Sequence, residues 1–129
     1  MRKLILLLLI IGFIFGCSII KKRLPSPYPV TGGILFQYEA PSARQVNLAG
    51  DFPDNQWLQD GDKTDLMYDD GTHGDLTAND GIWSLVKTLS IGRYQYKFVI
   101  DRNTWVEDPN TPETTDDGYG GKNSVLIVK

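Results

Sequence analysis

The residues best suited to chemistry lie within residues 92–109, which read GRYQYKFVIDRNTWVEDP. Side chains alternate along the first nine positions as they do on a β-strand with one buried face. The core-facing set is Tyr94, Tyr96, Phe98 and Ile100, and the opposite, open face carries Gln95, Lys97 and Val99. Residues 101–103 predict a tight turn, after which Trp105 begins the returning strand. A lysine and a tryptophan presented on one sheet surface suit a flat ligand rich in hydroxyl groups, such as a sugar.

A second group of polar side chains lies in residues 69–81, which read DDGTHGDLTANDG. Its carboxylates belong to Asp69, Asp70, Asp75 and Asp80, and such oxygens are the ligands that calcium prefers. Their spacing is not that of an EF-hand loop, and aspartates also accept bonds from backbone amides in turns. Both interpretations stay open. We favour the hydrogen-bonded turn and expect the protein to bind no metal and no cofactor. The only histidine, His73, is predicted to be a surface residue.

The composition offers little for catalysis. A Ser–His–Asp site would have to use the single histidine, which lies in the acidic segment. A carboxylate pair such as Asp69 and Asp80 could resemble a glycosidase dyad, but a small β-domain is not expected to form a deep cleft. We therefore predict that the protein is not an enzyme.

The first residues predict an export signal. Two basic residues precede an apolar run over residues 4–15, and Gly16 and the single cysteine, Cys17, follow. This order resembles the lipobox of bacterial lipoproteins, which implies cleavage after residue 16 and acylation of Cys17, for example with palmitate. The alternative is an uncleaved signal anchor over residues 4–20, although the basic residues 21–23 disfavour its orientation. Both interpretations place the rest of the chain on the cell envelope, outside the cytoplasmic membrane.

The charge of the chain excludes one class of partner. The formal net charge is −3, and residues 1–16 hold two basic and no acidic side chains, so the remainder carries −5. An acidic domain is a poor partner for phosphates, and we expect no binding to nucleic acid.

The chain after residue 16 divides into a linker and one domain. Residues 17–30 hold prolines at positions 25, 27 and 29 and predict an extended linker. Residues 31–129 predict an all-β domain, because short apolar or alternating runs are separated by turn residues and none has helical periodicity. The strand candidates are residues 34–38, 46–49, 66–68, 82–89, 92–100, 105–106 and 124–128. This pattern is typical of an immunoglobulin-like β-sandwich, with Trp83 in its core.

The order of motifs over residues 31–129 resembles the glycogen-binding domain of the AMP-activated protein kinase β-subunit and the related N-terminal domains of isoamylases and branching enzymes. Residues 46–52, VNLAGDF, followed by Trp57, resemble the family's G-x-F-N-x-W loop with two extra residues. Residues 92–98 resemble its central strand, residues 101–105 its D-G-x-W hairpin, residues 107–109 its x-D-P and residues 117–124 its loop before the last strand. The resemblance implies an immunoglobulin-like β-sandwich of the early-set type.

The family holds sugar with two tryptophans, a lysine, an apolar loop residue and an asparagine. The matching positions here are Trp57, Trp105, Lys97, Tyr119 and Asn123. The resemblance therefore implies a non-catalytic module that binds an α-glucan, stacks sugar rings on aromatic side chains and bonds hydroxyls through Lys97 and Asn123. The alternative is an envelope scaffold that binds a protein partner through the same face, because exposed aromatic residues also serve protein interfaces.

Overall fold

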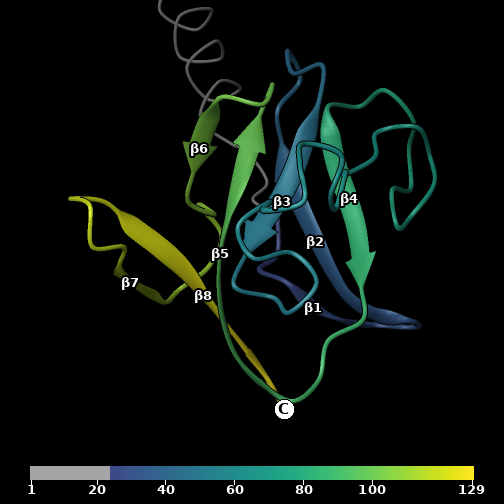
Figure 1. Ribbon diagram of the computed structural model, residues 1–129. Coiled ribbons are helices and arrows are strands. Elements are labelled where there is room, and N and C mark those ends of the chain that lie inside the picture. The colour runs from purple at the N-terminus through teal and green to yellow at the C-terminus, as the bar shows by residue number, and fades with distance from the viewer. Residues whose placement is uncertain (1–23) are drawn as a thin grey trace, which may run out of the picture.

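The computed structural model describes residues 24–129, which form two antiparallel β-sheets (Figure 1). The first sheet has the order β1–β2–β4, with bounds Tyr28–Val30, Gly33–Glu39 and Ile82–Lys87. The second has the order β3–β5–β8–β7, with bounds Val46–Gly50, Gly92–Ile100, Lys122–Val128 and Thr114–Asp116, and β6 (Thr104–Val106) also pairs with β5. The predicted all-β fold is confirmed for this part of the chain, whereas the immunoglobulin-like type stays a prediction.

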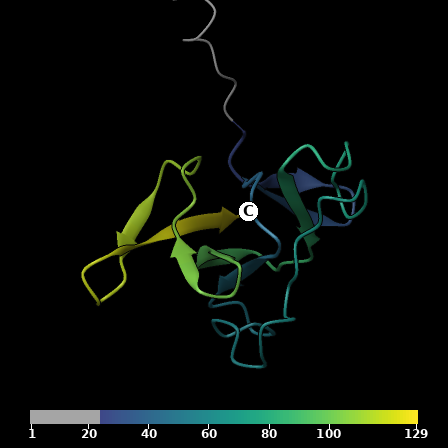
Figure 2. The same ribbon diagram turned by 90° about the horizontal axis from the view of Figure 1, so that it is seen from above.

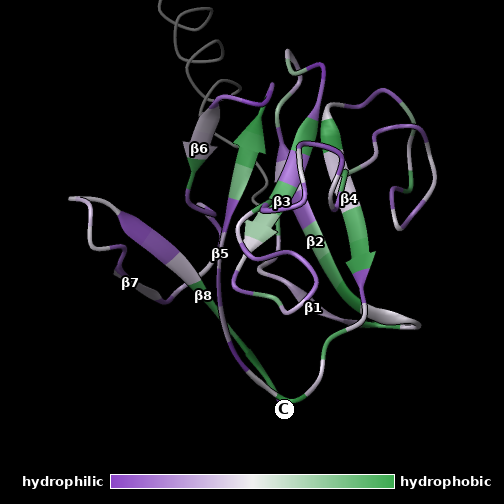
Figure 3. Ribbon diagram, in the orientation of Figure 1, coloured by the Kyte–Doolittle hydropathy of each residue, from purple (hydrophilic) through white to green (hydrophobic). Residues whose placement is uncertain are grey.

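The two sheets enclose an apolar core, and the view from above separates them (Figure 2). Phe36 of β2 meets Tyr96 of β5 edge to face at 5.3 Å between ring centroids. Leu85 of β4 and Leu48 of β3 belong to the same cluster, as does Phe98. Apolar residues concentrate on the central strands, and hydrophilic residues dominate the connecting loops (Figure 3). The alternation predicted for residues 92–100 therefore places Tyr96 and Phe98 inside, as expected.

The opposite face of β5 is less open than predicted. Val99 is buried, although its position in the alternation put it on the open face with Lys97. Val99 lies beside Asn47 in the register of β3, and the Asn47 amide donates to the carbonyl oxygens of Asp62 (2.8 Å) and Thr64 (2.9 Å). A polar segment thus packs over this end of the face. The expectation of an open face is wrong at Val99 because segments far away in the sequence cover it.

Residues 66–68, predicted as a short strand, connect the two sheets. The Met67 amide donates to Val46 at the edge of β3, while Tyr68 and Ser84 of β4 exchange two backbone bonds of 2.8 Å. Trp83 precedes Ser84 in β4 and packs, partly buried, against the core. Its indole nitrogen donates to the Ala40 carbonyl at 3.0 Å.

The first sheet begins within the segment that the sequence predicted as linker. Strand β1 pairs with β2, from Tyr28 opposite Leu35 to Val30 opposite Gly33. Strand β1 lies at the edge of the sheet, where proline is tolerated because alternate N–H groups face away from the neighbouring strand. The predicted signal peptide and Cys17 lie outside the described residues. Among residues 24–129 there is no helix long and apolar enough to cross a membrane.

Candidate functional site

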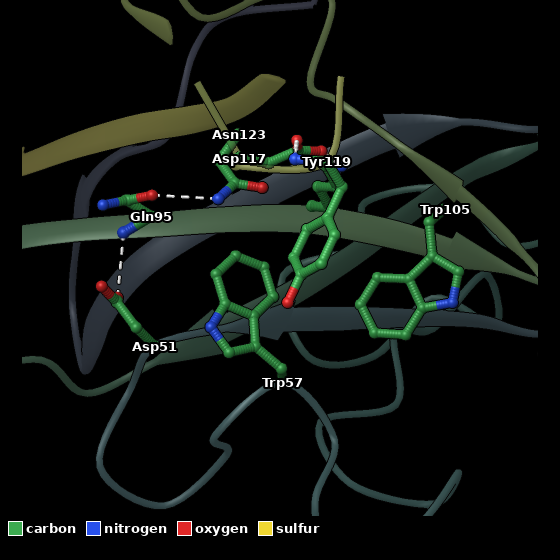
Figure 4. A pocket seen from close by; sticks show the side chains of 8 residues that line it. Asp51, Trp57, Gln95, Trp105, Asp117, Tyr119 and Asn123 are labelled. Carbon is green, nitrogen blue, oxygen red and sulfur yellow. Dashed lines mark hydrogen bonds and ion pairs between the residues drawn. The ribbon is translucent and has the colours of Figure 1, made fainter. Parts of the chain in front are cut away.

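A hollow of about 500 Å³ brings together all five residues predicted to form a site. Its lining consists of Asp51, Trp57, Gln95, Lys97, Trp105, Asp117, Tyr119 and Asn123, and Figure 4 shows the arrangement. The predicted residues come from five separate segments: the loop after β3, then β5, β6, the β7–β8 loop and β8. Sequence reasoning missed three lining residues. The sequence did contain features that could have indicated them. Gln95 lies on the same strand face as Lys97, and Asp51 and Asp117 lie within the motifs that resemble the family.

Three aromatic side chains dominate the hollow. In Figure 4 the Tyr119 ring lies between the indoles of Trp57 and Trp105. Tyr119 is 95% exposed and Trp105 is 44% exposed, which is unusual for large aromatic residues of a small β-domain. The apolar face of a sugar ring or of another planar group could pack on such surfaces.

The Trp57 loop has an uncommon backbone. Gln56, Trp57 and Leu58 all have positive φ angles, of 47°, 58° and 63°. This left-handed conformation costs roughly 1–2 kcal/mol per residue that has a Cβ atom. The Trp57 amide donates to the Gly50 carbonyl at 2.7 Å, which ties the loop back to the end of β3.

Asn55 organises this loop from inside. Its side chain is only 1% exposed. Its carbonyl oxygen accepts from the amides of Gly50 (3.1 Å) and Leu58 (3.0 Å), and its amide donates to the Leu48 carbonyl (2.8 Å) and to Asp65 (2.7 Å). These bonds connect Asn55 to the end of β3, to Leu58 within the loop and to Asp65 beyond it. Asn55 therefore fixes the loop conformation that places Trp57 at the hollow.

A buried lysine of the other sheet also holds the loop. Lys87 of β4 is 6% exposed, and its ammonium lies 2.8 Å from Asp54 and 2.9 Å from Asp65. It also sits 5.3 Å from the centre of the Phe52 ring. Burial by itself lowers the Lys87 pKa, but the hydrogen bonds to Asp54 and Asp65 outweigh burial, so the pKa is raised. Lys87 therefore stays charged and joins Asp54 and Asp65, on either side of Asn55.

Lys97 lies in the hollow but is already paired. Its ammonium donates to Asp117 at 2.9 Å, and both side chains are largely shielded. The other oxygen of Asp117 accepts from the amides of Tyr119 (2.7 Å) and Gly121 (3.0 Å), which shapes the loop that carries Tyr119. The hydrogen bond from Lys97, helped by that from the Tyr119 amide, lowers the pKa of Asp117 to about 2. An ammonium has three donors, so Lys97 can still offer N–H groups to a hydroxyl beside its ion pair.

The remaining polar groups form a connected floor. Asn123 is buried, and its amide donates to the side-chain oxygen of Gln95 at 2.9 Å. The Gln95 backbone amide donates to Asp51 at 2.9 Å (Figure 4). Asn123 thus forms part of the floor of the hollow.

The acidic segment forms the hydrogen-bonded turn that the sequence favoured. Asp69, Asp75 and Asp80 accept from the backbone amides of Gly81, Gly71 and Ile82, and Asp70 accepts from Thr72. The exposed His73 ring stacks on Tyr68 at 3.7 Å.

Three of these carboxylates also lie close together. Asp69, Asp75 and Asp80 each place an oxygen within 4.8 Å of the others, and Asp70 is not part of that group. Burial, with the neighbouring carboxylates of Asp80 and Asp75, raises the pKa of Asp69. None of the four acidic residues lines the hollow.

Comparison with known proteins adds no identification: no protein-family model and no curated protein sequence matches this chain. The resemblance to glycogen-binding domains therefore stays a prediction.

Proposed function

We propose that residues 31–129, together with strand β1, form a non-catalytic carbohydrate-binding module for an α-glucan chain of the glycogen or starch type. The observation that carries the proposal is that Trp57, Lys97, Trp105, Tyr119 and Asn123, taken from five separate segments, line one hollow. Three aromatic surfaces suit the apolar faces of successive sugar rings. The amide and charged groups around them suit the hydroxyl rims.

The hollow favours weak, reversible binding. It is open to solvent, since Tyr119 and Trp105 are exposed, and few of its groups would be fully desolvated by a ligand. We therefore expect dissociation constants on the order of micromolar to millimolar.

Titration calorimetry with maltoheptaose and glycogen tests the proposal. The full chain is purified in a detergent without a sugar headgroup, because an alkyl maltoside would compete for the hollow. Trp57→Ala and Trp105→Ala should each weaken binding at least about tenfold, which corresponds to about 1.4 kcal/mol. Trp83→Phe is the matched control, because Trp83 is outside the lining of the hollow.

Two results would count against the module. Absence of binding to both ligands is one, and wild-type affinity in both hollow variants is the other. Capture of a membrane protein that free glucan does not displace would instead favour the envelope scaffold.

We further propose that the domain is held on the cell envelope by lipid attached to Cys17. The support is the order of basic, apolar and small residues before that cysteine. Labelled palmitate should enter the wild-type chain and not Cys17→Ser. An unlabelled chain that still sediments with membranes would support the uncleaved anchor.

A further inference from the structure

The side chains that line the hollow carry more negative than positive charge. Its lining contains three formally charged side chains, Asp51, Lys97 and Asp117. Lys97 and Asp117 neutralise each other across 2.9 Å. Asp51 forms no ion pair with any residue of the part described, 24–129, and one of its oxygens accepts only a neutral backbone amide, that of Gln95. The hollow therefore presents a net charge of about −1 to a ligand.

Asp51 is held in place to act on a ligand. Its backbone amide donates to the Gln95 carbonyl at 3.1 Å, and its carboxylate accepts from the Gln95 amide at 2.9 Å. The two bonds fix Asp51 at the end of β3 against β5. In Figure 4 its side chain stands at the same end of the hollow as Trp57. The second carboxylate oxygen can accept a hydrogen bond from a sugar hydroxyl.

We propose that the hollow selects uncharged glycan chains and rejects chains that bear carboxylate, sulfate or phosphate groups, with Asp51 as the residue that sets this selectivity. The inference rests on the proposed function and adds the charge class of the ligand to it.

The surroundings of the hollow act in the same direction. The only cation in its lining is Lys97, and an anionic ligand could pair with it only by competing with Asp117. Asp117 does not give way by protonation, because its pKa of about 2 keeps it ionised. Residues 24–129 hold eight basic and sixteen acidic side chains, so the long-range field also opposes an anion.

The test compares two ligands that differ only in charge. Maltohexaose and the same hexasaccharide oxidised to carboxylates at C6 are titrated into the full chain at low ionic strength and again at about 150 mM salt. We expect the oxidised ligand to bind at least tenfold more weakly at low salt. This difference in affinity, called the gap below, should become smaller as salt is added. Asp51→Asn keeps an oxygen for the Gln95 amide and should reduce the gap at least threefold. Asp60→Asn removes one acid outside the hollow and should reduce the gap much less than Asp51→Asn does.

The outcomes separate this inference from the proposed function. If maltohexaose binds and the oxidised ligand binds equally well or better, charge selection is refuted and the glucan module stands. If the gap persists undiminished in Asp51→Asn, the assignment to Asp51 is refuted. If maltohexaose does not bind at all, the proposed function fails and this inference fails with it.

Discussion

Replacement of Asn55 by alanine should destabilise the domain and disorganise the Trp57 loop. The Asn55 side chain is 1% exposed and makes four hydrogen bonds, of 2.7 to 3.1 Å. Alanine removes all four and leaves the amides of Gly50 and Leu58 and the carbonyl of Leu48 without this partner.

The size of the effect follows from those bonds. A hydrogen bond within a protein contributes about 1 kcal/mol net, and a buried group left without its partner costs about 1–3 kcal/mol. Some relaxation and entry of water reduce the sum, so we expect a loss of about 3–4 kcal/mol. That is a large part of the 5–15 kcal/mol typical of a folded domain. The melting temperature should fall by roughly 10–20 °C.

Urea unfolding followed by circular dichroism measures the loss. The matched control is Asn103→Ala, because Asn103 is exposed and accepts one bond, from the Thr104 hydroxyl. The control should change stability by less than about 0.5 kcal/mol. A loss below about 1 kcal/mol in Asn55→Ala would refute the reasoning, since it would mean that the loop is held without this side chain.

Three further substitutions test other parts of the structure. Tyr96→Phe should cost about 1.5–3 kcal/mol in urea unfolding, because it removes the hydroxyl that donates to the buried Asp108 carboxylate at 2.7 Å; an unchanged midpoint would contradict this. Gly50→Ala should cost about 1–3 kcal/mol, because the new Cβ would lie 2.6 Å from a backbone oxygen of β5; wild-type stability would show that the strands can separate. Asp117→Asn tests pH dependence. The Asp117 pKa is lowered from 3.8 to about 2, mainly by the Lys97 hydrogen bond, so its stabilisation is present above the unfolded pKa and is lost as the pH falls through the folded value. The stability difference between wild type and Asp117→Asn should therefore be constant above about pH 5 and shrink between about pH 4 and pH 2, and a constant difference down to pH 2 would contradict the assignment.

Local patterns were enough to predict most of the strands, although β1 and β7 were not among the candidates. The candidate site residues came from the order of motifs that resembles a known family. The period of two in residues 92–100 places Tyr96 and Phe98 in the core and Lys97 away from it, because successive side chains of a strand point to opposite faces. Turn residues at 101–103 return the chain so that Trp105 pairs opposite Val99. These features depend on neighbours within a few positions, and that information is written directly in the sequence.

Pairing between distant segments could not be predicted in the same way. Lys97 meets Asp117 across twenty positions, so the lysine expected to be a free donor to a ligand is also part of a structural ion pair. Val99 is covered because Asn47 bonds to residues 62 and 64. Each outcome depends on which loop folds over which strand, and neither periodicity nor residue type specifies that choice.

The position of Trp57 depends most on such distant contacts. Trp57 and the residues on both sides of it all have a left-handed backbone conformation. This conformation is unfavourable by roughly 1–2 kcal/mol at each position. The conformation persists because Asn55 bonds the loop to β3, and because Lys87, from the opposite sheet, holds Asp54 and Asp65 on either side of it. Neither Asn55 nor Lys87 lines the hollow. The residue types that would contact a ligand can thus be recognised from motifs, but their orientation is set by buried polar residues behind them, so substitutions there should alter binding without touching the ligand.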